Sequence, residues 1–384
     1  MGKYSFRDIV IDSRTGLNPR KNFKLGNGNN YYITIKDIHN GRIEITDKTD
    51  RIDDEAVEKI KKRSRIKNGD ILFTSIGRIG ETAIVHDKND TWEVNESIFI
   101  FTINSEIIDA EYFCILLQSS ELQERLAKDS SGSTFKSIKM NQLEKLSFDL
   151  PTIAEQRKIS ININKVSNLI NLCNTILEKL DLLVKSRFVE MFCNTDDKRT
   201  IADICSIITD GTHQPPKFTQ DGIPFLFVSN IVTNEITYNA EKFISEETYD
   251  ELYKRTPIEI GDIVLSTVGS YGHPAVVKTN KKFLFQRHIA YLKPISSVVN
   301  SIYLHSAILS NDAQRQIEER VKCIAQKTLN LSEIRKITVP IPPLALQEQF
   351  AAFVEQTDKS KLAVKQVLEK AETLKKALMQ EYFG

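Results

Sequence analysis

The sequence lacks the features of a membrane protein or a secreted one. No apolar stretch approaches the roughly 20 residues that a membrane-spanning helix requires, and the start, from Met1 to Phe6, soon runs into charge, unlike a signal peptide. The five cysteines are scattered, with no Cys-x-x-Cys pair, and their number is odd. This pattern indicates reduced thiols that are mostly buried. We therefore expect a cytoplasmic protein that does not associate with membranes.

Known constellations of catalytic residues are also missing. The six histidines show no metal-ligand spacing such as His-Glu-x-x-His. The Gly-x-x-Gly turns at 77–80 and 269–272 lack the lysine and hydroxyl residue of a phosphate-binding loop. Neither Pro-Pro pair stands in the Asn/Asp-Pro-Pro-aromatic tetrapeptide expected of an amino-methyltransferase. We expect a chain without catalytic activity, cofactor or metal ion.

An excess of one charge is absent as well. Lysine and arginine total 52 against 51 acidic residues, which leaves a net charge of +1. A protein coated in positive potential is excluded, but a local basic face balanced by acidic residues elsewhere is not. With 384 residues, of which 41% are hydrophobic, the chain has enough apolar material for two domains and connectors.

What the sequence does contain is a copy of itself. The segment 69–80, which begins Gly-Asp-Ile-Leu, returns 192 residues later as 261–272, and Leu-Glu-Lys at 177–179 returns 191 residues later at 368–370. Since the chain has 384 residues, the period equals its half-length. Such a period is too long for a solenoid unit and indicates one domain plus one connector, duplicated. A duplicated recognition domain indicates a binding target that consists of two half-sites.

Each half runs through the same order of expected elements. Aromatic and β-branched runs bounded by turn formers, such as 31–35 and 225–228, predict strands. A helix is expected around 110–126 and again around 301–321, followed by a lysine and a strand that ends at proline. We therefore predict an α+β protein with a mixed domain in each half, at 1–150 and 197–342.

Long helices are expected after the prolines, at 151–196 and 343–384. Apolar residues spaced four and three apart predict a heptad seam sustained for about four heptads, and some 35–40 helical residues make a rod of roughly 55–60 Å. The copy at 343–384 is less regular, and residues 357–361 interrupt its pattern. A helix with one apolar stripe needs a partner, so we expect the two to pair antiparallel in a pseudo-twofold molecule. The seam positions of the first helix are Ile159, Ile163, Val166, Ile170, Cys173, Leu177, Leu180 and Val184.

Two segments suggest binding but allow a plainer interpretation. Six cations crowd into nine residues at 59–67, which is typical of a solvated helix face but also of phosphate contacts. The counterpart around Arg255 keeps only two cations. Asp210-Gly211-Thr212-His213 offers a tight turn with an exposed hydroxyl and imidazole, either as a simple turn capped by its aspartate or as a base-reading loop. The corresponding loop 13–19 of the first half differs in composition.

The order of these motifs resembles that of one known family. The motifs of the second half are, in order, Asp210–His213, Gly222–Leu226, Gly261–Ser266, Gln286–Ala290 and Pro342–Ala345. The first half lacks Asp-Gly-Thr-His and carries weaker versions of the last two motifs, Asn95-Glu96-Ser97-Ile98 and Pro151-Thr152-Ile153-Ala154. The order and duplication of these motifs over the whole chain resemble the DNA-specificity subunit of type I restriction–modification systems.

This resemblance implies two target-recognition domains and two conserved spacer helices that dock two methyltransferase subunits and, through them, restriction subunits. It implies a subunit without activity of its own that binds double-stranded DNA at a bipartite, asymmetric, gapped site. An enzyme with its own active site and a coiled-coil scaffold that never touches DNA are the alternatives. In the first half the expected contact residues are Lys36, Arg78, Asn95, Glu96 and Lys136; in the second half they are Thr212, His213, Ser270, Tyr271, Arg287, His288 and Lys327.

Overall fold

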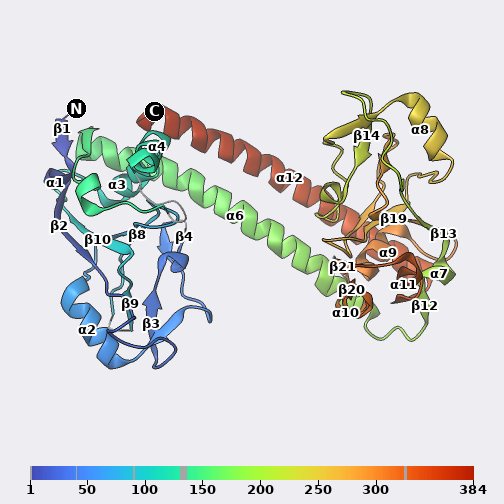
Figure 1. Cartoon of the computed structure of the whole chain (residues 1–384), viewed down its shortest axis with the longest axis horizontal. Coiled ribbons are helices and arrows are strands. Elements are labelled where there is room, and N and C mark those ends of the chain that lie inside the picture. Colours follow the sequence, from blue (N-terminus) through green and yellow to red (C-terminus); the bar gives the residue numbers. More distant parts are fainter. Residues whose placement is uncertain (1, 40, 90, 130–135, 324–326) are drawn as a thin grey trace. The chain divides into compact units, whose positions relative to one another are not determined.

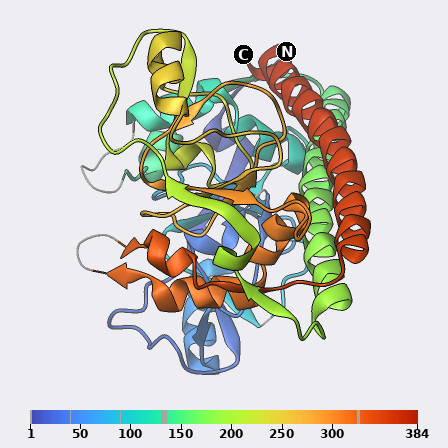
Figure 2. The same cartoon turned by 90° about the vertical axis from the view of Figure 1, so that its right-hand side faces the viewer.

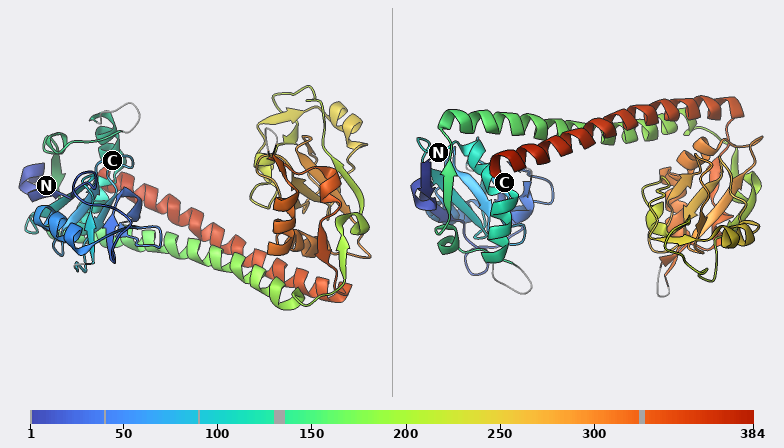
Figure 3. Two further views of the ribbon diagram at one scale, coloured as in Figure 1. Left: turned by 60° about the horizontal axis from the view of Figure 1, so that its bottom comes forward. Right: turned by 90° about the horizontal axis from the view of Figure 1, so that it is seen from above.

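The protein forms two compact units. The computed structural model describes residues 2–39, 41–89, 91–129, 136–323 and 327–384. The first unit consists of Met1–Leu172 together with Val367–Gly384, and the second of Cys173–Gln366. Each unit combines short helices and small sheets with parts of two long helices, α6 (Ile153–Phe192) and α12 (Leu344–Phe383) (Figures 1 and 3). Within the described ranges, no helix is both long and apolar enough to cross a bilayer.

The first unit contains the N-terminal set of elements. Its strands are β1 (Gly2–Ser5), β2 (Val10–Thr15), β3 (Asn30–Ile33), β4 (Ile38–His39), β5 (Arg42–Ile43), β6 (Asp50–Ile52), β7 (Ile71–Thr74), β8 (Thr82–Ile84), β9 (Trp92–Val94), β10 (Ile98–Ile103) and β11 (Ser147–Leu150). Its short helices are α1 (Phe6–Ile9), the 3-10 helix η1 (Ile35–Asp37), α2 (Asp54–Ser64), α3 (Ala110–Leu117), α4 (Ser120–Asp129) and α5 (Met140–Leu143).

The second unit, whose helix α8 is yellow in Figure 2, repeats this order. Its strands are β12 (Lys198–Thr200), β13 (Cys205–Asp210), β14 (Ile223–Leu226), β15 (Lys242–Ile244), β16 (Ile263–Ser266), β17 (Pro274–Val276), β18 (Leu284–Phe285), β19 (Ile289–Pro294), β20 (Lys322–Cys323), β21 (Lys327–Thr328) and β22 (Thr338–Pro340). Its short helices are α7 (Ile201–Ile204), the 3-10 helix η2 (Val228–Asn230), α8 (Glu246–Tyr253), α9 (Ser301–Ile308), α10 (Asn311–Arg320) and α11 (Leu331–Ile334).

The sheets of the two units share one topology. A four-stranded antiparallel sheet has the order β2-β10-β7-β8 in the first unit and β13-β19-β16-β17 in the second. A three-stranded sheet has the order β6-β3-β9 or β15-β14-β18, and its last two strands are parallel in both units. The pairs β1-β11 and β12-β22 complete the match. The predicted duplication and the mixed α+β class are therefore confirmed.

The helix expected around 110–126 is in fact two helices, and so is its copy. In the second unit α9 ends before Leu309, and Ser310 caps α10 because its hydroxyl accepts a hydrogen bond from the amide of Ala313 at 3.3 Å. A serine that accepts from its own following turn favours a new helix start over continuation.

The long helices begin just after the prolines, as predicted, and the first ends at Phe192. A capping box starts α6, in which Thr152 and Glu155 exchange side-chain and backbone hydrogen bonds. All eight predicted seam positions are buried or half-buried. The predicted domain boundaries stay a prediction, because the division into compact units cuts through the long helices rather than at their ends.

Within the second unit the two helices run antiparallel. Asp181 of α6 pairs with Lys361 of α12, whereas Phe192, further along α6, packs against Phe350, which is earlier in α12. In the first unit Ile163 joins the same apolar core as Phe383. Each unit therefore contains residues from the opposite ends of the two helices.

Polar residues occupy the seam of α12 where an interruption was expected. Thr357 is buried and Lys361 is half-buried, so the inward positions continue through the segment 357–361. The hydroxyl of Thr357 donates to the carbonyl of Phe353 at 2.9 Å. The expected interruption is wrong because the inward positions keep the heptad spacing: Thr357 bonds within its own helix, and Lys361 pairs with Asp181 of α6.

Candidate functional site

In the second unit, backbone hydrogen bonds bring three of the predicted segments together. The amide of Thr267 donates to the carbonyl of His288 at 2.9 Å, and that of Leu329 donates to Thr267 at 2.8 Å. The amide of Gly269 donates to the carbonyl of Lys327 at 3.1 Å. The Gly-x-x-Gly turn, the Gln-Arg-His segment and the lysine segment are thus neighbours.

The Asp-Gly-Thr-His loop is fastened to the same place. Thr212 donates its amide to Phe285 at 3.0 Å and accepts from the amide of Arg287 at 3.1 Å. A Cβ atom at Gly211 would lie 2.2 Å from the carbonyl oxygen of Phe285, so only glycine permits this approach. The loop is therefore held on both sides, and the exposed His213 follows it.

A polar hollow of about 470 Å³ lies among these segments. Arg287 is exposed, and its Nε donates to Nε2 of His288 at 3.4 Å. Burial and then the positive charge of Arg287 lower the pKa of His288, which favours a neutral ring. The hollow therefore offers a cation and an imidazole side by side. Its lining is Asp210, Thr267, Val268, Arg287, His288, Thr328, Leu329, Asn330 and Leu331.

The remaining predicted residues of the second unit differ in exposure. Ser270 and Lys327 are exposed, whereas Thr212 is half-buried. Tyr271 is also half-buried, and its side chain packs against the apolar core. The Tyr271 ring therefore anchors the Gly-x-x-Gly turn to the core and also forms part of the surface of that turn.

The first unit repeats the same hydrogen bonds. The amide of Ser75 donates to the carbonyl of Ser97 at 2.9 Å, and that of Ile138 donates to Ser75 at 2.9 Å. Gly77 donates its amide to the carbonyl of Lys136 at 3.1 Å. The Gly-x-x-Gly turn, the Asn-Glu-Ser segment and the exposed Lys136 are again neighbours. Equivalent positions are thus assembled twice.

Arg78 is tied to its own unit, which the sequence did not indicate. Its guanidinium donates to the carbonyl of Ile35 at 3.1 Å, lies 3.0 Å from Nδ1 of His39 and forms a 3.1 Å ion pair with Glu81. These contacts fasten the segment that carries the exposed Lys36 to the turn. A base contact by Arg78 stays a prediction, and it would require giving up part of this network.

Asn95 and Glu96 lie beside the same turn. The side-chain oxygen of Asn95 accepts from the amide of Ser97 at 3.0 Å, as in an Asx turn, so part of its hydrogen-bonding capacity is already used. Glu96 is half-buried. Whether either contacts DNA stays a prediction.

The loop 13–19 proves to be the counterpart of Asp210–His213. A Cβ atom at Gly16 would lie 1.8 Å from the carbonyl oxygen of Val94, the same close approach that Gly211 makes. Both glycines directly follow a corresponding strand, β2 or β13. The first unit therefore has the half-buried Leu17 and Asn18 where the second has Thr212 and the exposed His213. The glycine that directly follows the first edge strand, Gly16 or Gly211, is the sequence signal by which the two loops can be matched.

Sequence reasoning missed two arginines that hold these loops. In the first unit, Nε of Arg63 donates to the hydroxyl of Thr15 at 3.2 Å. In the second, Arg255 donates to a carboxylate oxygen of Asp210 at 2.7 Å. The cation run at 59–67 is thus divided: Lys59 pairs with an acidic neighbour one turn away, as a solvated helix face would, whereas Arg63 reaches the loop.

The repeated Gly-Asp pair is structural. Asp70 accepts a hydrogen bond from the amide of Lys67 at 2.8 Å and forms a buried 2.9 Å ion pair with Arg14. Asp262 accepts from the amide of Glu259 at 2.8 Å and pairs with Lys293. Each carboxylate closes the turn before an inner strand of its four-stranded sheet, β7 or β16.

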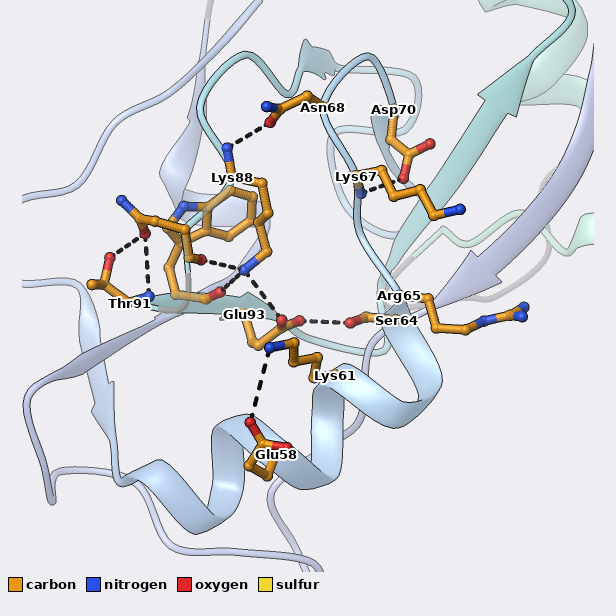
Figure 4. A network of polar contacts seen from close by, with 12 residues as sticks. Glu58, Lys61, Ser64, Arg65, Lys67, Asn68, Asp70, Lys88, Thr91 and Glu93 are labelled. Carbon is orange, nitrogen blue, oxygen red and sulfur yellow. Dashed lines mark hydrogen bonds and ion pairs between the residues drawn. The ribbon is translucent and has the colours of Figure 1, made fainter.

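Figure 4 shows Glu93, a buried acidic residue of the first unit, with its polar contacts. The carboxylate of Glu93 accepts from the hydroxyl of Ser64 at 2.7 Å and lies 3.3 Å from Nζ of Lys88. Burial raises the pKa of Glu93, and the Lys88 ammonium opposes that rise. Leu284 takes the equivalent position in the second unit, as the strand pairing shows. This network is therefore specific to one unit.

The described residues contain no cluster of three or more histidine, cysteine, aspartate or glutamate side chains that could hold a metal ion. Among the cysteines, burial raises the pKa of Cys114 and Cys205 to about 12, which disfavours the reactive thiolate. Neither thiol is therefore suited to act as a nucleophile.

Comparison with known proteins gives one consistent result. The sequence profile described as type I restriction modification DNA specificity domain matches residues 4–182 and again residues 196–373. The EcoBI specificity subunit of Escherichia coli is 30% identical over 146 residues, which are 38% of this chain and 31% of that protein. The MjaIX specificity subunit of Methanocaldococcus jannaschii is 27% identical over 350 residues, or 84% of this chain and 79% of that protein.

Solved structures extend the likeness to the fold. The S subunit of a type I restriction–modification system from M. genitalium superimposes with a TM-score of 0.62 at 14% identity, covering 100% of this chain and 96% of that one. A chain from a study of complex assembly and conformational transition of the type I R-M system has a TM-score of 0.56 at 16% identity and coverages of 100% and 97%. At these identities the likeness concerns the fold alone.

Proposed function

Since this chain belongs to the type I restriction modification DNA specificity family, we propose that it is a specificity subunit that binds double-stranded DNA at a bipartite, asymmetric, gapped site. The observation that carries the proposal is the repeated assembly of the Gly-x-x-Gly turn, the lysine segment and the loop after the first edge strand. Each assembly combines an exposed lysine with polar loop residues, and cations near phosphates supply affinity while side chains at base edges supply specificity. In this proposal residues 1–150 and 197–342 are the target-recognition domains.

The two half-sites are proposed to differ because the two surfaces differ. Leu17 and Asn18 occupy one loop and Thr212 and His213 the other, while Arg78, which forms an ion pair with Glu81, has the small Ser270 as its counterpart. Identical surfaces would favour a palindromic target. Unequal ones favour two unrelated half-sites.

The spacer helices, at 151–196 and 343–384, are proposed to dock two methyltransferase subunits. Both units expose large apolar side chains of these helices, such as Leu172 at 55% in the first and Leu182 at 61% in the second. Exposed apolar side chains on a helix favour a partner helix. One subunit for each unit follows from the repeat, and restriction subunits would join through them. We place the complex in the cytoplasm and assign methylation and cleavage to those partners.

Selection from a random pool tests this function. The full-length chain, alone and with its methyltransferase subunits, is mixed with random duplexes, and the bound duplexes are sequenced. Enrichment of two short, different motifs separated by a fixed unread gap is the expected result. Binding without sequence enrichment, or no binding, would instead favour the coiled-coil scaffold.

A further inference from the structure

The loop of the second unit contains a carboxylate that joins a cation and an imidazole. Oδ1 of Asp210 accepts from Arg255 at 2.7 Å, and Oδ2 lies 2.9 Å from Nε2 of His213. The Asp210 side chain is 18% exposed, and those of Arg255 and His213 are 50% and 53% exposed. The carboxylate is therefore fixed from one side while the imidazole remains open to a ligand.

The contact with Asp210 distinguishes the two ring nitrogens of His213. Nε2 lies 2.9 Å from a carboxylate oxygen of Asp210, and an ionised carboxylate only accepts hydrogen bonds, so this contact favours a ring proton on Nε2 over one on Nδ1. In the neutral form of such a ring, Nδ1 is a bare acceptor that points away from the carboxylate.

The backbone around this dyad leaves the loop little freedom. Thr212 is hydrogen-bonded through both its amide and its carbonyl, to Phe285 and Arg287, and the close approach at Gly211 excludes a larger residue. A ligand group that reaches the loop therefore meets the His213 ring in a fixed orientation.

We propose that Asp210, held by Arg255, fixes the His213 ring so that its Nδ1 accepts a hydrogen bond from an exocyclic amine of a base, adenine N6 or cytosine N4. These are the amino donors that bases present in the major groove, whereas guanine offers only acceptors there. Asp210 and Arg255 are positioning residues in this arrangement, and His213 is the contact. This inference rests on the proposed DNA-binding function. The first unit has Thr15 in place of Asp210 and Asn18 in place of His213, so this pair of side chains would act at one half-site only.

The state of the ring is tested without DNA. Nitrogen-15 NMR of histidine side chains in the full chain, with His213→Gln used to assign the signal, reports which nitrogens carry hydrogen. A proton on Nε2 alone is expected, and Asp210→Asn should shift the balance toward Nδ1. A proton on Nδ1, alone or together with Nε2, would overturn the proposal.

The base contact is tested on the selected site. His213→Ala should reduce selectivity about tenfold at one position of one half-site, and Asp210→Asn should relax the same position. Gln214→Ala, an exposed neighbour in the same loop, is the matched control and should leave the selected motif unchanged, while Asn18→Ala should leave that half-site unchanged.

Base analogues identify the donor. Replacing the base at the relaxed position by one without its amine, nebularine for adenine or 2-pyrimidinone for cytosine, should weaken binding of the unchanged chain about tenfold and of the His213→Ala chain very little. A loss caused instead by 7-deazapurine, which removes an acceptor, would overturn the proposal, and so would an unchanged motif in His213→Ala. If the unchanged chain selects no motif at all, the proposed function itself fails, whereas the NMR result still reports on the dyad.

Discussion

The ammonium group of Lys361 lies 2.6 Å from a carboxylate oxygen of Asp181, and this ion pair joins the two long helices within the second unit. The same ammonium lies 3.8 Å from Asp358, and its side chain is only 18% exposed. A lysine thus occupies a seam position that an apolar residue usually fills. Two carboxylates make that position favourable to a cation.

Reversing this charge should loosen the second unit. Lys361→Glu would place a third carboxylate beside Asp181 and Asp358, and we expect a loss of about 1 kcal/mol in the free energy of unfolding, a modest value because Asp181 is largely exposed. Lys359→Glu, an exposed residue with the same change in charge, is the control. Chemical denaturation of both variants measures the effect, and equal losses would contradict the role of the ion pair.

The C-terminal residues complete the first unit. The ring of Phe383 lies 5.3 Å from that of Tyr112 and is 8% exposed within the core of that unit. Phe383→Ala should destabilise the first unit by about 3 kcal/mol, at the low end for a buried aromatic. Amide hydrogen exchange should show faster exchange in α3 and β11 but not in the second unit.

Phe350→Ala provides the reciprocal control. Phe350 is fully buried against Phe188 and Tyr303 in the second unit, so the same truncation there should accelerate exchange around α9 and leave α3 unchanged. Faster exchange in both units from either change would mean that they do not unfold separately.

Sequence patterns predicted the repeat and the long helices, because both rest on the spacing of residues along the chain. The position of the lysine beside the Gly-x-x-Gly turn was not predicted and comes from backbone hydrogen bonds between distant segments. The contacts of Arg78 with Ile35 and of Arg255 with Asp210 could not be predicted, because these partners lie 43 and 45 residues away in the sequence and depend on how strands pair. The seam position of Lys361 was missed for the same reason, since its favourable surroundings come from another helix.

The buried Glu93 makes the stability of the first unit depend on pH. Burial raises its pKa in the folded state above the ordinary value of 4.5, so the folded unit binds this proton more tightly than the unfolded chain does. The contribution to stability is therefore greatest below that ordinary value and is lost as pH rises through the folded pKa.

Glu93→Gln should remove that part of the pH dependence. The slope of unfolding free energy against pH, measured by urea denaturation upward from about pH 4.5, should become flatter than in the unchanged chain. Glu96→Gln, a half-buried residue near the end of the same strand, serves as the control and should keep the slope. Equal slopes for the unchanged chain and Glu93→Gln would contradict the raised pKa.

Lys327 is expected to contact a phosphate. It is exposed beside the Gly-x-x-Gly turn, so Lys327→Ala should weaken binding similarly on all DNA sequences and reduce the slope of log affinity against log salt by about one. Lys136→Ala should do the same in the first unit. Salt titrations with cognate and random duplexes measure both.

Arg287→Ala is the contrasting variant for that measurement. If Arg287 pairs with a guanine, its loss should cost about 1–3 kcal/mol on the cognate half-site and little on random DNA. Equal losses on cognate and random duplexes would assign Arg287 to the backbone.

The proposed function requires that one chain contain two different DNA-recognition domains. Single-molecule sequencing of modified bases in cells that carry this chain with its methyltransferase tests this requirement most directly. We expect one motif made of two unlike half-sites, with a gap of fixed length whose bases are not read and with centres about one helical turn, or 10 base pairs, apart. A contiguous motif, a palindrome or the absence of any modified motif would contradict it.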